Sequence, residues 1–116
     1  MKIYIAGPIS NGGKIRDSKM QELFVEDAIQ AGIALLVMGH APFIPHLNFY
    51  FEQKIKSWGF KLTHEDYLKW DFEWVKQSDA LLRLPGTSNG SDQEVQLAKE
   101  LGIPVYYSLE EVPDAV

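Results

Sequence analysis

Two acidic residues occupy helical positions that would normally carry apolar side chains. Glu94 shares one face of a predicted helix with Ala98 and Leu101, since residues at i, i+4 and i+7 lie on the same side. Asp71 lies in a second predicted helix, where the positions one turn away are apolar: Tyr67, Leu68, Trp74 and Val75. A carboxylate on a buried face must be hydrogen-bonded, paired or used in chemistry. Glu94 and Asp71 are therefore candidates for a nucleophile and an acid or base.

Each acid also has a structural interpretation. Ser91 and Glu94 have the spacing of a capping box, in which the glutamate bonds back to a backbone N–H at the start of the helix. Asp71 could cap a loop or pair with a lysine or arginine. Two acids on the buried faces of separate helices favour the functional interpretation without excluding the structural one.

Other candidate site residues lie at strand ends and in small polar turns. Tyr4 is in the middle of a predicted strand; a core role is the commoner explanation, but its hydroxyl could also position a carboxylate. Backbone N–H groups in two turns could bind an anion or polar ligand, and His46 after the second strand is expected to line the pocket. The residues of the two turns are Gly7, Ser10, Ser88, Asn89 and Gly90. The three histidines lack a metal-binding spacing, so we expect no metal and no cofactor.

The elements that must position these residues alternate between strands and helices. We expect strands at residues 2–6, 41–45, 78–84 and 104–107, and helices at 18–38, from 63 or 64 to 77, and from 89–91 onward. Residues 46–62 suggest an irregular or short-helix excursion over the sheet edge, and 109–112 a last helical turn. This alternation predicts one α/β domain over residues 1–116, with a parallel sheet of four or five strands between two helical layers. Ligands bind at the carboxyl edge of such sheets.

Composition narrows the class of partner. The net charge of -5 argues against a nucleic-acid polymer or an anionic membrane as partner, because both attract basic surfaces. There is no cysteine, and no secretion signal is recognisable, so a cytoplasmic protein is the default expectation. The aromatic-rich region 46–75 exceeds what a small monomer easily buries, which suggests a homo-oligomer, a dimer or higher.

Four segments, taken together and in order, resemble the nucleoside 2-deoxyribosyltransferase superfamily. This superfamily includes the deoxynucleoside 5′-monophosphate N-glycosidases and small uncharacterised, often phage-associated proteins. The matching segments are residues 3–7, 39–45, 71–79, and 88–90 with Glu94 and Ala98. The resemblance implies a flavodoxin-like (Rossmann-like) three-layer sandwich that acts on a small nucleoside or nucleotide.

The resemblance also implies a role for individual residues. Glu94 matches the glutamate that attacks C1′ of the sugar and forms a covalent glycosyl-enzyme. Asp71 matches the aspartate that assists the leaving base, and Tyr4 the tyrosine that orients the nucleophile. Ser88 matches a serine that contacts the 5′-phosphate in the monophosphate enzymes. Pro8 and Ser10 stand where those enzymes carry a serine and an arginine.

Three functions remain open from the sequence. The first is cleavage or transfer at the N-glycosidic bond of a (deoxy)nucleoside or its 5′-monophosphate. The second is a catalytically silent nucleotide-binding or regulatory domain of the same fold. The third is an interaction domain in which Glu94 and Asp71 are structural. Both ligand-binding functions require Glu94, Asp71 and Tyr4 to meet at one pocket.

Overall fold

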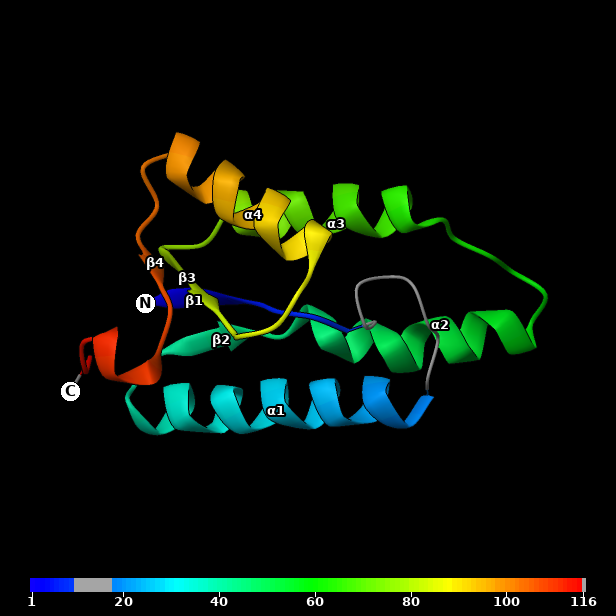
Figure 1. Ribbon diagram of the computed structural model, residues 1–116, viewed down its shortest axis with the longest axis horizontal. Helices are drawn as coiled ribbons and strands as arrows, with labels where there is room; N and C mark the ends of the chain where they lie inside the picture. Colours follow the sequence, from blue (N-terminus) through cyan, green and yellow to red (C-terminus); the bar gives the residue numbers. More distant parts are fainter. Residues whose placement is uncertain (10–17, 116) are drawn as a thin grey trace.

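A parallel sheet of four strands forms the middle layer of the structure (Figure 1). The computed structural model describes residues 1–9 and 18–115. The strands are β1 (Lys2–Ala6), β2 (Ala41–Phe43), β3 (Ala80–Arg83) and β4 (Val105–Tyr106), in the spatial order β2-β1-β3-β4. This is the strand order of flavodoxin-like folds, so the predicted α/β class is confirmed. Leu81 of β3 and Phe43 of β2 lie beside Tyr4 on either side.

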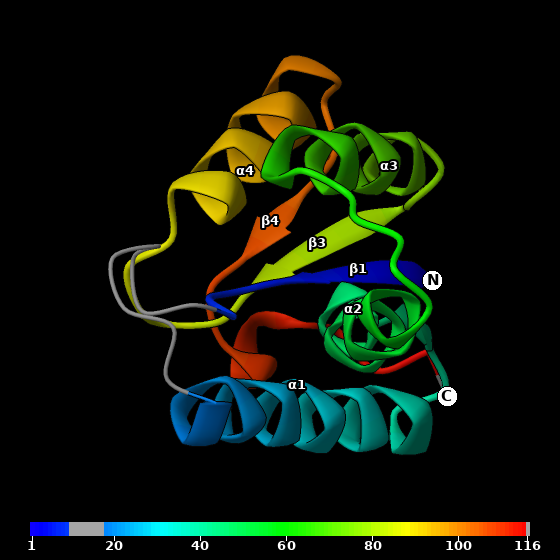
Figure 2. The same ribbon diagram turned by 90° about the vertical axis from the view of Figure 1, so that its right-hand side faces the viewer.

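Helices cover both faces of this sheet. Helix α1 (Ser18–Val37) packs below it in Figure 2, and α3 (His64–Lys76) and α4 (Asn89–Glu100) pack above it. A short 3-10 turn, η1 (Pro45–Leu47), leads into α2 (Asn48–Ser57), which extends beyond the sheet in Figure 1. A second 3-10 turn, η2 (Leu109–Glu111), follows β4. The layers are thus those of the predicted three-layer sandwich.

The alternation of side chains along β1 assigns its residues to two separate core clusters. Ile3 and Ile5 pack with the α1 side, in a cluster that includes Ala28 and Leu35. Tyr4 and Ala6 face the other way and pack with residues of α3 and α4, which are Val75, Val95 and Ala98. Because successive strand residues point to opposite faces, this register turns the Tyr4 ring toward the helices that carry Asp71 and Glu94.

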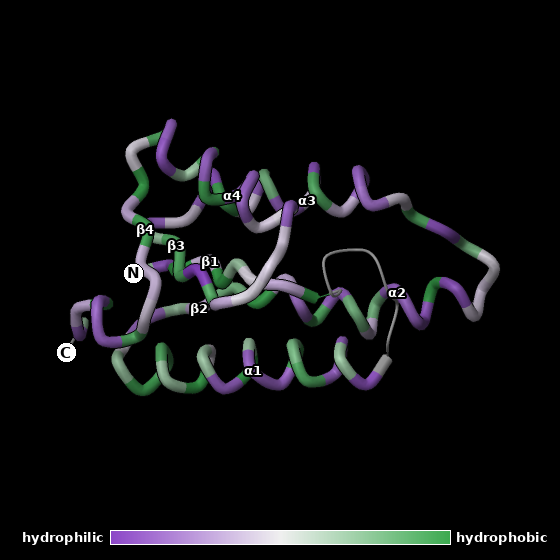
Figure 3. The backbone as a smooth tube through the Cα atoms, in the orientation of Figure 1, coloured by the Kyte–Doolittle hydropathy of each residue, from purple (hydrophilic) through white to green (hydrophobic). Residues whose placement is uncertain are grey.

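Some of the predicted apolar faces are wrong. Leu101 is 51% exposed, because α4 ends at Glu100 and Leu101 is its C-cap residue. In α1, the buried stripe runs through Val25, Ala28 and Leu35, and Leu23 lies outside it, 54% exposed. Exposed hydrophobic residues of this helix include Ile33, Leu36 and Val37. Much of α1 is green in Figure 3, in turns that carry hydrophobic residues.

Several element boundaries also differ from those expected. Strand β2 ends at Phe43, before the proline that starts η1 and has no backbone N–H to give to a ladder. For residues 46–62 we predicted either an irregular segment or a short helix. The short helix is confirmed, because the segment contains the ten-residue α2. Within residues 1–9 and 18–115, no helix is long and apolar enough to cross a membrane.

Gly86, in the loop after β3, is held against the loop after β1. Its φ is +120°, and a Cβ there would lie 2.8 Å from Cγ of Pro8. Gly102 also has a positive φ, +73°, but a Cβ there would meet nothing within 4 Å. We therefore expect Gly86→Ala to lower the free energy of unfolding by about 2 kcal/mol, and Gly102→Ala by about 1 kcal/mol. Urea denaturation of both variants measures the difference; equal losses would contradict a specific contact with Pro8.

Candidate active site

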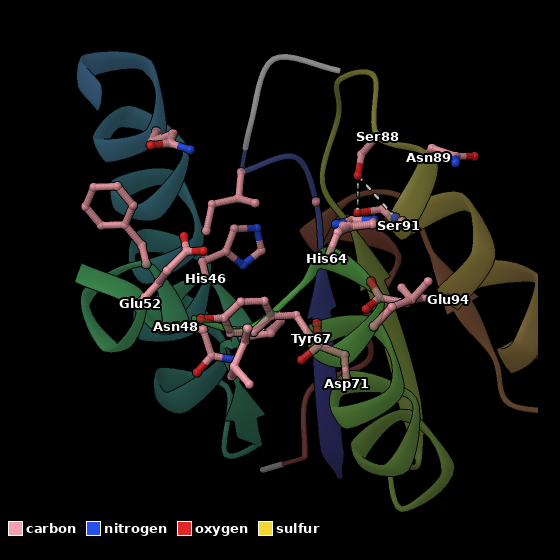
Figure 4. Close-up of a pocket in the computed structure, with 18 residues that line it drawn as sticks. His46, Asn48, Glu52, His64, Tyr67, Asp71, Ser88, Asn89, Ser91 and Glu94 are labelled. Carbon is pink, nitrogen blue, oxygen red and sulfur yellow. Dashed lines mark hydrogen bonds between the residues drawn. The ribbon is translucent and has the colours of Figure 1, made fainter. Parts of the chain in front are cut away.

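A cavity of about 450 Å³ opens at the carboxyl edge of the sheet, between the α2 side and the start of α4 (Figure 4). Its lining includes most of the residues predicted from the sequence, which are Gly7, His46, Asp71, Ser88, Asn89, Gly90 and Glu94. Tyr4 is fully buried and reaches this wall through Glu94. Ser10 lies outside the described residues. The structure therefore brings together the three side chains whose convergence the ligand-binding functions require.

The central contact joins β1 to α4. The hydroxyl of Tyr4 donates a hydrogen bond of 2.6 Å to Oε2 of Glu94, and both side chains are buried. The Tyr4 ring stacks on Phe43 with ring centroids 5.7 Å apart, and Phe43 stacks in turn on Trp74 at 5.1 Å. This aromatic stack fixes the hydroxyl, so the Glu94 carboxyl is held in one orientation at the cavity wall.

Helix α4 begins in a way that leaves Glu94 free of a capping role. Ser88 is the N-cap residue, and its Oγ accepts the backbone N–H of Ser91 at 3.1 Å. Glu94 is six residues after the cap, in the second turn, so the predicted capping box of Ser91 and Glu94 is wrong. The helix starts at Asn89, before Ser91, so the spacing between Ser91 and Glu94 does not mark its first turn. The acid of the first turn is Asp92.

Burial dominates the electrostatics of Glu94. Desolvation raises the pKa of its carboxyl to about 8, the hydrogen bond from Tyr4 opposes this, and the nearby Asp71 raises it further. Arg83 lowers the pKa by a smaller amount. The Arg83 guanidinium is held by the carbonyl oxygens of Leu84 and Gly86 and lies 3.3 Å from Asp92. It therefore acts on Glu94 through its charge, without a direct contact.

Asp71 provides the second carboxyl of the cavity. Burial raises its pKa to about 7, and the Tyr4 hydroxyl opposes this shift. Its Oδ1 is buried and has no hydrogen-bond partner among the described residues. Two neighbouring carboxyls with raised pKa values titrate as a pair, so between about pH 7 and pH 8 they share about one proton, which lies on Glu94 more often than on Asp71. One ionised carboxylate beside one protonated acid is the combination that glycosidic-bond chemistry uses.

Buried polar atoms without partners converge on the same cavity. Among the described residues, such atoms are both ring nitrogens of His46, Oη of Tyr67 and Oδ1 of Asp71, and all three residues line the cavity. Burial lowers the pKa of His46 to about 4, although the adjacent Gly7 backbone opposes this, so its ring is neutral at pH 7. Leaving such groups unsatisfied is costly, which indicates that a polar ligand or water completes the site.

Sequence reasoning missed several polar residues of the lining, including Asn48, Glu52, His64 and Tyr67. Tyr67 could have been found, because it lies one helical turn before Asp71 on the same face. Asn48 and Glu52 depend on where α2 lies over the sheet edge, which no local pattern indicates. No cluster of three or more acidic or histidine side chains suited to a metal ion occurs in the part of the chain that the structure describes.

The raised pKa of Glu94 predicts a pH-dependent stability. Its folded pKa of about 8 exceeds its ordinary 4.5, so the unfolded chain loses this proton first and stability falls as pH rises between these values. Glu94→Gln removes this penalty while keeping an acceptor for Tyr4. We expect a free energy of unfolding about 1 to 3 kcal/mol above wild type at pH 8, and little difference at pH 4.5.

Chemical denaturation at the two pH values measures this effect. The matched control is Glu100→Gln, which removes an exposed carboxylate from the last turn of the same helix and should leave stability unchanged. A Glu94→Gln variant less stable than wild type at pH 8 would show that the ionised carboxylate stabilises the fold and is not a buried cost.

Comparison with solved structures identifies a similar fold. A 2-deoxyribosyltransferase from the psychrotolerant bacterium Bacillus psychrosaccharolyticus, characterised as a biocatalyst for the synthesis of nucleosides, superimposes with a TM-score of 0.59. The two are 21% identical in sequence, and the match covers 90% of this chain and 69% of the other. The comparison with curated proteins gave no match. The family model described as "Domain of unknown function (DUF4406)" matches residues 1–107, nearly the whole chain, and the protein therefore belongs to this family.

Proposed function

We propose that the protein cleaves or transfers the N-glycosidic bond of a (deoxy)nucleoside or its 5′-monophosphate. The observation that carries this proposal is the buried Glu94, which accepts a hydrogen bond from Tyr4 and shares a cavity wall with Asp71. An oriented carboxylate beside a second carboxyl of raised pKa matches the two-carboxyl logic of glycoside cleavage. The similarity of fold to a 2-deoxyribosyltransferase supports the same class of substrate.

The first step starts from the form of the pair in which Asp71 holds the shared proton, which is the minor form because the pKa of Glu94 is the higher of the two. In this form, ionised Glu94 attacks C1′ of the sugar. A bond forms between the glutamate oxygen and C1′, while the bond from C1′ to the base nitrogen breaks and its electron pair goes to the base. Protonated Asp71 gives its proton to the departing base, which leaves neutral. Tyr4 keeps the carboxylate oriented toward C1′, and the positive charge developing at that carbon favours the ionised form of Glu94.

In the second step, the glycosyl-enzyme is resolved. Asp71, now ionised, takes a proton from water, whose oxygen attacks C1′ and releases Glu94; this outcome is hydrolysis. If the nitrogen of a second base attacks instead and Asp71 takes its proton, the outcome is transfer. Both routes return the pair of carboxyls to the state with one proton.

The start of α4 suits the polar groups of the sugar. Ser88, Asn89 and Gly90 line the cavity at a helix N-terminus, where backbone N–H groups and the helix dipole favour an oxygen-rich or anionic group. Gly90 lies next to the His64 ring, since a Cβ at this position would make ordinary contact with it at 3.7 Å. We assign this end of the cavity to the 5′ side of the sugar.

A catalytically silent nucleotide-binding domain is the second candidate function. The raised pKa of Glu94 favours it, because in the empty site at neutral pH much of the Glu94 population is protonated and cannot attack. In that case the same cavity binds a nucleoside or nucleotide without breaking it.

That the protein forms a homo-oligomer stays a prediction.

Removal of the proposed nucleophile separates the two candidates. We expect Glu94→Gln to lower base release about 10³-fold or more and to leave nucleoside binding within a fewfold of wild type, because the amide keeps the shape and the Tyr4 contact. A screen of nucleosides, deoxynucleosides and their 5′-monophosphates for free base, with binding followed by calorimetry, measures both. Glu100→Gln is the control and should be fully active. Wild-type protein that binds a nucleoside but releases no base would reject the enzyme and favour the silent domain.

The shared proton predicts a bell-shaped pH profile of kcat/KM, with its maximum between the pKa values of about 7 for Asp71 and about 8 for Glu94. Activity falls at low pH because both carboxyls are protonated, and at high pH because both are ionised. Asp71→Asn should lower activity about 10²-fold and abolish the high-pH limb, since no acid remains to ionise. Initial rates from pH 5 to 10 measure the profile; an unchanged high-pH limb in the variant would exclude Asp71 as the acid.

A further inference from the structure

Glu52 provides a third carboxyl to the cavity, from the wall opposite Glu94. It lies on α2 and is half-buried, and no cation pairs with it in the described part of the chain. After burial, the charge of Glu52 is the main cause that raises the pKa of the Tyr67 hydroxyl. Figure 4 shows Glu52 on the same side of the cavity as His46 and Asn48, and Glu94 on the side of α4. A half-buried carboxylate at a cavity wall, with no cation beside it among the described residues, is a hydrogen-bond acceptor that the donors of a ligand can reach.

Its neighbours on this wall also lack partners. His46 is 3% exposed, and neither ring nitrogen makes a hydrogen bond with the described residues, although the Gly7 backbone lies close. The Oη atom of Tyr67 is likewise buried without a partner. A neutral histidine offers one donor and one acceptor, and a tyrosine hydroxyl can do either. This half of the cavity therefore has the unsatisfied groups of a recognition site, in addition to the acid.

The cavity wall formed by Glu52, His46 and Tyr67 lies where the base of the substrate would bind. This assignment rests on the proposed function. An acid that protonates the departing base must lie beside that base, which places the base next to Asp71. Tyr67 is one turn earlier on α3, so the base extends from Asp71 along Tyr67 toward α2 and Glu52. The Tyr67 ring is stacked on Trp70, with centroids 6.3 Å apart, and offers a supported aromatic surface to a flat base.

We propose that Glu52 selects a base that presents an amino group next to a protonated ring nitrogen, as guanine does. A carboxylate only accepts hydrogen bonds, and two adjacent donors satisfy both of its oxygens. Uracil and thymine offer a single N–H between two carbonyl oxygens, which the carboxylate repels. A site built to accept hydrogen bonds from a substrate discriminates strongly against an analogue that lacks one of the donors. The substrate class is thus the guanine-type nucleosides or their monophosphates.

Two substrates that differ by one amino group test this assignment. Base release is measured from 2′-deoxyguanosine and 2′-deoxyinosine, and from their 5′-monophosphates, because inosine lacks only the 2-amino group. We expect wild type to favour the guanine substrate by about 10- to 100-fold in kcat/KM, the value of one hydrogen bond to a charged acceptor. Glu52→Gln should bring this ratio within a fewfold of one. Glu73→Gln, which removes an exposed carboxylate from α3, should keep the wild-type ratio.

The outcomes separate this inference from the proposed reaction. Equal rates for both substrates in wild type, or an unchanged ratio in a Glu52→Gln protein with wild-type thermal unfolding, overturn the role of Glu52 and leave the reaction standing. If no substrate releases base, the reaction fails, and titration calorimetry with the same four compounds decides the subsite. Tighter binding of the guanine compounds that disappears in Glu52→Gln supports the role of Glu52 in selecting the base. Equal binding of the two bases, or no binding of either, overturns it.

Discussion

The hydrogen bond between Tyr4 and Glu94 sets the condition that the rest of the site must meet. It places a carboxyl against β1 inside the protein, where desolvation makes the charged form costly. The bond forms only if the even-numbered face of β1 points to α3 and α4 and if α4 starts at Asn89. The stack of Tyr4, Phe43 and Trp74 then holds the hydroxyl in place. Strand register, helix start and aromatic packing are thus coupled through one contact.

The site is kept at a cost to stability. Glu94 and Asp71 both have pKa values raised by burial, so each keeps its proton to a higher pH than a surface acid does, and ionising it inside the protein is costly. The unpartnered buried atoms of His46, Tyr67 and Asp71 add to this cost, and all of them line one cavity. A purely structural role would be expected to satisfy these groups within the protein. Their concentration at one place is therefore better explained by a ligand that completes them.

The two walls of the cavity, one at the start of α4 and one on the α2 side, offer different groups to a ligand. The start of α4 contributes Glu94 and the backbone donors of Ser88 to Gly90, which suit a sugar. The α2 side contributes neutral His46 and Glu52, which has no cationic partner within residues 1–9 and 18–115; both suit a base with donors. Asp71 lies between them on α3, which in the proposed reaction is the position next to the bond that breaks. Because α2 extends beyond the sheet, changes in this helix could alter which base is accepted without disturbing the sheet that positions Tyr4.

The sequence by itself determined the α/β class with its parallel sheet and the anomaly of Glu94 and Asp71, because periodicity and local spacing report which face of an element a residue occupies. It misjudged the capping role of Glu94 and the burial of Leu101, since both depend on where α4 begins and ends. Only the tertiary structure decided that Asn48 and Glu52 join the cavity and that the buried polar atoms meet there. Such contacts join residues far apart in the chain, and their geometry is set by how α2, α3 and α4 pack on the sheet rather than by any local pattern.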